Sequence, residues 1–179
     1  KYLGMASKFK DKLYHVAGNH DIYKGGYPLF KEYFGDPYYS FDYKNSHFII
    51  LDNSLSKSFD HKQFEWLREE LQNNQNKNVF VFLHRPLFDP TEIYKDYVMS
   101  GRKAVEELIS LFRKYKVDYV VAGHLHGYAR EKRGETVYLV TGGGGAPLYL
   151  PKELGGFYHY VKIRVAGNQI EDEAIRIYE

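Results

Sequence analysis

The 179-residue sequence contains no cysteine, only two methionines and a single tryptophan. Without cysteine the chain forms no disulfide and offers no thiolate, so any metal ligand must come from His, Asn, Asp or Glu. No run of about 20 apolar residues is present, and the sequence therefore predicts no membrane-spanning helix. The net charge of +2 is too small to indicate a polyanionic or membrane partner.

The residues that are abundant indicate a globular protein. Hydrophobic residues make up 44% of the chain, enough for a full core, and 18 tyrosines add aromatic surface. The length suits one domain, and neither a repeat nor a linker interrupts the sequence. We therefore predict a single domain over residues 1–179.

Helical and extended patterns alternate through the middle of the chain, which predicts the α/β class. The apolar run Val79–Leu83 is typical of a strand buried on both faces. We predict helices at 2–10, 60–74 and 101–115, strands at 14–17, 79–83, 117–122 and 136–141, and hairpins at 38–52 and 158–177.

Three of these predicted strands end in side chains that bind metals or transfer protons. The motifs are Gly18-Asn19-His20-Asp21, then His84, then Gly123-His124-Leu125-His126. Taken singly, the first is more often a polar turn with a helix cap and His84 is more often a structural histidine, whereas His124-Leu125-His126 is as often a ligand pair as a structural turn. Together they indicate a site, because open α/β sheets place their sites at the carboxyl ends of strands. Imidazole and amide ligands without thiolate suit Mn, Fe, Zn or Co rather than Ca.

The order and spacing of these motifs resemble the calcineurin-like metallophosphoesterase superfamily over essentially the whole chain. The segment Phe82-Leu83-His84-Arg85-Pro86 is similar to its phosphohydrolase branch, which includes relatives of purple acid phosphatases and cyclic-nucleotide phosphodiesterases. This resemblance implies a layered α-β-β-α sandwich with two mixed sheets. It also implies a hydrolase of small phosphomonoesters or phosphodiesters that uses two divalent or trivalent metal ions, Mn, Fe or Zn.

The resemblance further implies a role for each site residue: Asn19, His84 and His124 would bind one metal, His126 the other, and His20 would protonate the leaving oxygen while Asp21 orients it. Two metals roughly 3.5–4 Å apart activate a nucleophile and neutralise phosphoryl charge. A positioned imidazole that protonates the departing alkoxide is typically worth about 10²–10⁴-fold in rate.

The family pattern also begins with Asp-x-His and Gly-Asp on two earlier strands, and neither motif precedes residue 18. We therefore expect the chain to lack the first strands of the fold and to be incomplete at its N-terminus. On this interpretation it carries at most a partial metal site and has little activity alone.

Two alternative functions are a nuclease and a non-catalytic scaffold of the same superfamily. A nuclease would need a basic groove with stacking aromatics, which the near-neutral charge disfavours. A scaffold would be expected to have lost the site histidines, and they are present here.

Other polar features are expected to be structural. We interpret His15, His47 and His61 as structural or surface residues, and Arg85 as a salt-bridge partner or a phosphate clamp. The glycines at 142–145 do not match a P-loop, and we expect them to permit close backbone approach beside the site.

Overall fold

The computed structural model describes residues 2–9, 12–55 and 59–177. Its main sheet has six strands in the order β1-β2-β3-β4-β6-β5. The strands are β1 (Tyr39–Tyr43), β2 (Ser46–Ile50), β3 (Asn78–Leu83), β4 (Tyr119–Ala122), β5 (Tyr128–Arg133) and β6 (Thr136–Thr141). The four central strands are parallel, and β1 and β5 pair antiparallel at the two edges, so the sheet is mixed.

A second, smaller sheet consists of the antiparallel hairpin β7 (His159–Ala166) and β8 (Gln169–Arg176). The helices are α1 (Tyr2–Ala6), α2 (Asn19–Ile22), α3 (Tyr27–Phe34), α4 (His61–Asn73) and α5 (Arg102–Lys114), with short 3₁₀ turns at Tyr23–Gly25, Lys95–Tyr97 and Lys152–Leu154. None of the helices in the described part of the chain is long and apolar enough to cross a bilayer.

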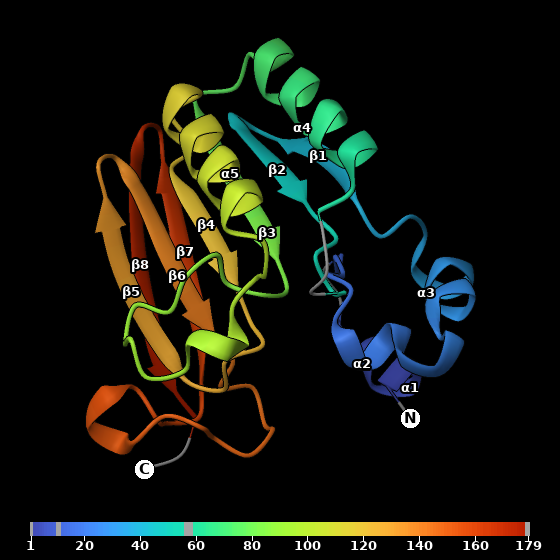
Figure 1. Cartoon of the computed structure of the whole chain (residues 1–179), viewed down its shortest axis with the longest axis vertical. Helices are drawn as coiled ribbons and strands as arrows, with labels where there is room; N and C mark the ends of the chain where they lie inside the picture. Colours follow the sequence, from blue (N-terminus) through green and yellow to red (C-terminus); the bar gives the residue numbers. More distant parts are fainter. Residues whose placement is uncertain (1, 10–11, 56–58, 178–179) are drawn as a thin grey trace.

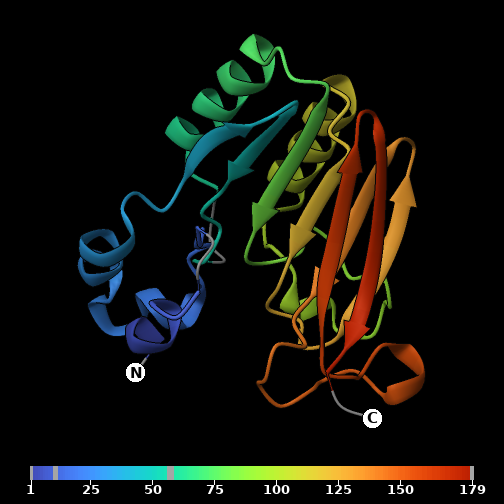
Figure 2. The same cartoon turned by 180° about the vertical axis from the view of Figure 1, so that it is seen from behind.

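The main sheet is covered on both faces. Helices α4 and α5 lie against one face, and the β7–β8 hairpin lies behind β4 and β6 on the other (Figures 1 and 2). Leu67 of α4 and Phe112 of α5 are fully buried against β3 and β4. Apolar side chains of the hairpin, such as Val161, pack on Phe80 and Leu139 from the opposite side. This double burial explains why the central strands are continuous apolar runs.

The α/β class and the sheet-on-sheet layering are confirmed. The described residues form a helical layer and two sheets, and the second sheet is antiparallel rather than mixed. Both long helices appear where their apolar spacing predicts them, and Asp60 caps α4 by accepting the backbone N–H of Lys62.

Two local predictions were wrong. Residues 14–17 form no strand, and the segment instead contacts β1 through the Tyr39 hydroxyl, which bonds both the N–H and the carbonyl of His15. The N-terminal helix ends at Ala6 rather than Lys10, a residue outside the described part of the chain. Strand β5 was not predicted, because its sequence is rich in charged residues that are typical of a solvent-exposed segment.

Candidate functional site

The carboxyl ends of β3 and β4 bring two histidines together. The strands pair in parallel up to Leu83 and Ala122, and the Gly123 N–H then donates to the His84 carbonyl. Beyond this point Nε2 of His84 lies 2.9 Å from Nδ1 of His124. Asn19 reaches the same place, with its Oδ1 2.7 Å from Nε2 of His84. Three of the four predicted metal ligands therefore converge.

The turn at Gly18 aims Asn19 at this point. A Cβ at Gly18 would lie 3.1 Å from the His84 ring, so only glycine fits comfortably between the segment and the histidine. The Gly18 N–H donates to Oδ2 of Asp21 at 2.8 Å, which closes the first turn of α2. Asp21 therefore stabilises the turn through the Gly18 backbone. Among the described residues it forms no hydrogen bond with His20. His20 is exposed on α2 beside Asn19.

Burial and neighbouring positive charge keep the two converging histidines neutral. Burial lowers the pKa of His84 to about 4, and Arg85, His20 and His126 add repulsion. Burial also lowers the pKa of His124 to about 3, followed by the effect of Arg85 and the other histidines. At pH 7 both imidazoles are therefore neutral, which is the protonation state that metal binding requires.

The three polar contacts of this cluster, Arg85–His124, His124–His84 and His84–Asn19, need one more proton than the side chains carry. An NH1 nitrogen of Arg85 donates to Nε2 of His124 at 2.7 Å, so the proton of neutral His124 sits on Nδ1 and points at His84. Nε2 of His84 then accepts, and it also faces the Asn19 oxygen, which is another acceptor. A cation between the two acceptors removes the repulsion. Without a cation, a flip of the Asn19 amide would supply the missing donor.

His126 lies beside this cluster but makes other contacts. Its ring stacks on Tyr149 with centroids 4.1 Å apart, and its Nδ1 donates to the Pro147 carbonyl at 2.7 Å. That hydrogen bond fixes the tautomer and leaves the lone pair on Nε2. His126 is close enough to lower the pKa of both His84 and His124 through its charge.

Sequence reasoning missed Asn53, which positions the segment after β3. Its side chain is buried, and its Oδ1 accepts the backbone N–H groups of His84 and Arg85, each at 2.9 Å. Its Nδ2 donates to the Arg85 carbonyl at 2.7 Å. The only signal in the sequence was an amide two residues after Leu51, the last residue of the apolar run that begins in β2.

Arg85 forms no ion pair with any described carboxylate. Its Nε donates to the Ser54 carbonyl at 3.3 Å, and its guanidinium lies against His124. Burial lowers its pKa, yet arginine stays protonated in proteins. The site therefore holds a fixed positive charge without a carboxylate partner.

The glycine run approaches the second histidine turn closely, as expected. A Cβ at Gly142 would overlap the carbonyl oxygen of Leu125, and a Cβ at Gly143 would overlap the buried ring of His159. His124 itself has φ of +60°, a left-handed conformation that side chains other than glycine rarely adopt. The Gly123–Gly127 turn is therefore held by packing in a strained backbone conformation.

The donor set fits one metal ion better than two. One amide oxygen and two neutral imidazoles converge, and these are ligands for Zn, Fe or Mn. Within the described residues, no group of three or more His, Asp or Glu side chains is arranged to hold a metal. His126 is the remaining predicted ligand, and it is near enough to the cluster to affect the pKa of both His84 and His124.

Comparison with known proteins agrees with this geometry. A family model described as calcineurin-like phosphoesterase matches residues 1–128. The chain is 31% identical over 150 residues to a phosphoenolpyruvate phosphatase of Allium cepa, covering 78% of this chain and 31% of that protein. It is 29% identical over 130 residues to an Fe(3+)-Zn(2+) purple acid phosphatase of Arabidopsis thaliana, covering 66% of this chain and 27% of the relative.

A solved structure shares the fold. The purple acid phosphatase from yellow lupin (Lupinus luteus) seeds matches 84% of this chain and 34% of its own, with a TM-score of 0.67 and 23% identity. The chain thus spans about a third or less of the length of these relatives.

Proposed function

Because the chain belongs to the calcineurin-like phosphoesterase family, we propose that its strand-end cluster acts in the metal-dependent hydrolysis of small phosphoesters. The single observation that carries the proposal is the convergence of Asn19, His84 and His124 at 2.7–2.9 Å, with too few protons to satisfy their acceptors. A cluster of this kind favours a cation at its centre.

In this proposal Asn19, His84 and His124 hold one metal, and His126 contributes to a second. The Fe(3+)-Zn(2+) relative supports a pair of metals, and the ions of this chain are proposed to be Mn, Fe or Zn. When bound, such ions supply Lewis-acid polarisation of the phosphoryl group and activation of water.

The protein's own groups bind and orient the phosphoester. The guanidinium of Arg85 has no carboxylate partner and is proposed to attract a phosphoryl oxygen, since arginine and phosphate form strong charge-assisted hydrogen bonds. The hydrogen bonds from Asn53 fix the backbone that carries the His84 and Arg85 side chains before substrate arrives. Little reorganisation is then needed on binding.

His20 is proposed as the general acid. It follows Asn19 directly on α2, is exposed to the space in front of the cluster, and takes no part in the described hydrogen bonds of His84 and His124. A proton on its imidazole is delivered to the departing alcohol oxygen, which leaves as the neutral alcohol. Asp21 assists by holding the turn that carries His20.

Metal binding tests this function. Titration calorimetry with Mn²⁺ or Zn²⁺ is expected to give about one tight site per chain, and His84→Ala or His124→Ala should weaken it by about 100-fold or more. His61→Ala is the matched control, because His61 is exposed on α4. Orthovanadate, a phosphate analogue, should bind only with metal present and less tightly in Arg85→Met. Metal affinity unchanged in both ligand variants would contradict the proposal.

A further inference from the structure

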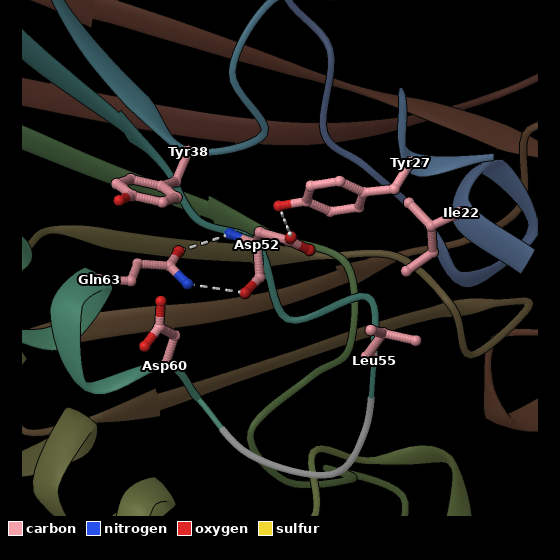
Figure 3. Close-up of a pocket in the computed structure, with 7 residues that line it drawn as sticks. All are labelled: Ile22, Tyr27, Tyr38, Asp52, Leu55, Asp60 and Gln63. Carbon is pink, nitrogen blue, oxygen red and sulfur yellow. Dashed lines mark hydrogen bonds between the residues drawn. The ribbon is translucent and has the colours of Figure 1, made fainter. Parts of the chain in front are cut away.

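A hollow of about 370 Å³ lies outside the histidine cluster, and Figure 3 shows the residues that line it. Two rings, two carboxylates and two aliphatic side chains line it, namely Tyr27, Tyr38, Asp52, Asp60, Ile22 and Leu55. Among the residues that the structure describes, the lining contains no lysine, arginine or histidine. Nothing in the proposed chemistry of the histidine cluster uses these groups.

The floor of the hollow is rigid and negatively charged. Gln63, which is almost fully buried, pins Asp52 by accepting its backbone N–H at 2.7 Å and donating to its carbonyl at 2.9 Å (Figure 3). The Asp52 carboxylate accepts hydrogen bonds from Ser54 and from the Tyr27 hydroxyl. Within the described part of the chain, the partners of the Asp52 and Asp60 carboxylates are neutral donors, and no basic side chain there forms an ion pair with either.

The walls suit an organic cation. The Tyr27 ring leans over Asp52, and Tyr38 is fixed by its contact with Trp66, with ring centroids 5.1 Å apart. Aromatic faces attract ammonium groups within about 6 Å, and carboxylates add direct charge attraction. Ile22 and Leu55 offer apolar contact to methyl or methylene groups. A metal ion fits less well, because it needs several convergent oxygen ligands and the described residues form no such group.

The hollow adjoins the histidine cluster through two elements. Strands β2 and β3 are parallel with Ile50 opposite Phe82, so Asp52 follows β2 at the level where His84 follows β3. Neighbouring strands lie about 4.8 Å apart. On the other side, Ile22 ends the single turn of α2 that begins at Asn19. The hollow and the cluster are therefore carried by adjacent strand ends and by the same turn of α2.

We propose that the hollow binds the alkylammonium end of the substrate, and hence that the substrates are phosphoesters of amino alcohols. This inference rests on the proposed phosphoesterase function for the phosphate end. The positive end would meet Asp52, Asp60 and the tyrosine faces while the phosphate meets the histidine cluster.

Choline and 3,3-dimethylbutan-1-ol test the inference directly, because they share a shape and differ only in charge. Calorimetric or NMR titration is expected to show choline binding at least about fivefold tighter than the neutral alcohol. Asp52→Asn and Tyr27→Leu should remove most of that preference. Asp36→Asn and Tyr33→Leu, which change an exposed carboxylate and an exposed ring outside the hollow, should keep it.

If Asp52→Asn fails to fold, Asp60→Asn serves in its place, because Asp60 is exposed. Equal affinity for choline and the alcohol, or choline binding unchanged in both Asp52→Asn and Tyr27→Leu, would overturn the inference. Displacement of choline by Mn²⁺ in the His84→Ala variant would also overturn it, since the hollow would then be a metal site.

The same titrations separate this inference from the proposed function. His84→Ala should lose metal binding and keep choline binding. Asp52→Asn should do the opposite and lose choline binding while it keeps metal binding. This result would show that the two sites bind independently. With metal present, phosphocholine should bind at least about tenfold tighter than choline, because both ends are then held. No gain from the phosphate would contradict the link between the two sites.

Discussion

The side-chain oxygen of Asn19 lies 2.7 Å from Nε2 of His84, although 65 residues separate them in the sequence. The contact joins the α2 turn to the end of β3, and every other member of the candidate site is placed relative to it. Four predictions follow from the contacts that maintain this arrangement.

Gly142→Ala is expected to destabilise the protein and weaken metal binding, because the added Cβ overlaps the Leu125 carbonyl between the two turn histidines. Overpacking of this kind typically costs about 1–3 kcal/mol. Gly144→Ala is the matched control, since a Cβ there meets no atom within 4 Å. Urea unfolding measures both variants, and equal stability would contradict the close approach.

Asn53→Ala is expected to weaken metal binding by about 10-fold while the ligands themselves stay in place. The substitution leaves the backbone N–H groups of His84 and Arg85 without their acceptor, at about 1–3 kcal/mol for an unsatisfied buried group. Asn168→Ala, in the exposed β7–β8 turn, is the control. A metal affinity equal to that of the parent protein would show that Asn53 serves stability only.

The free energy of unfolding of the metal-free protein is expected to fall as pH drops from about 6.5 to 4. The folded pKa values of His84 and His124, about 4 and about 3, lie below the ordinary 6.5, so in this range the unfolded chain binds protons that the folded chain excludes. Each histidine contributes up to about 1.4 kcal/mol per pH unit in this range, so the loss should reach several kcal/mol before it levels off below the folded pKa values.

Urea titrations at several pH values in the presence of a chelator measure this slope. His84→Ala should lower the free energy of unfolding at every pH. It should also reduce the pH dependence, because the variant lacks one of the two histidines with a lowered pKa. His61→Ala, at an exposed position, should leave the slope unchanged. A His84→Ala variant with the full parental slope would refute the assignment.

In an enzyme form that carries both metals, His20→Ala is expected to leave metal stoichiometry unchanged and to reduce turnover selectively. Hydrolysis of an alkyl phosphoester should fall by about 10²-fold or more, because the alkoxide then leaves without a proton. A nitrophenyl ester, whose leaving group needs little protonation, should lose less than about fivefold. Equal losses for the two esters, or a lost metal, would show that His20 has another role.

The sequence predicts the strand-end histidines well, because a buried parallel strand must be apolar until it ends. The run Val79–Leu83 therefore locates His84, and the strand that ends at Ala122 locates His124. Two strands that are parallel and adjacent then place these residues side by side. The glycine run was also interpreted correctly, since clustered glycines beside a strand end are typical of close backbone approach.

Other features depend on contacts that no local pattern encodes. Residues 14–17 have strand-like composition, but a strand exists only when a neighbour accepts its hydrogen bonds, and among the described residues that neighbour is the Tyr39 hydroxyl alone. The clamp by Asn53 depends on a partner 31 and 32 residues away. The sequence predicts that Asp21 orients His20. In the structure the Asp21 carboxylate instead accepts the Gly18 N–H, a backbone contact that no local pattern reveals.

At position 124 the left-handed backbone favours glycine, whereas the contact with Arg85 requires an imidazole ring. Glycine is the residue that best tolerates φ of +60°, and it would also remove a ring that sits beside Arg85. A chain selected for heat resistance alone would be expected to drift toward glycine there. Retention of histidine there in laboratory evolution would therefore report selection for the imidazole itself and not for stability.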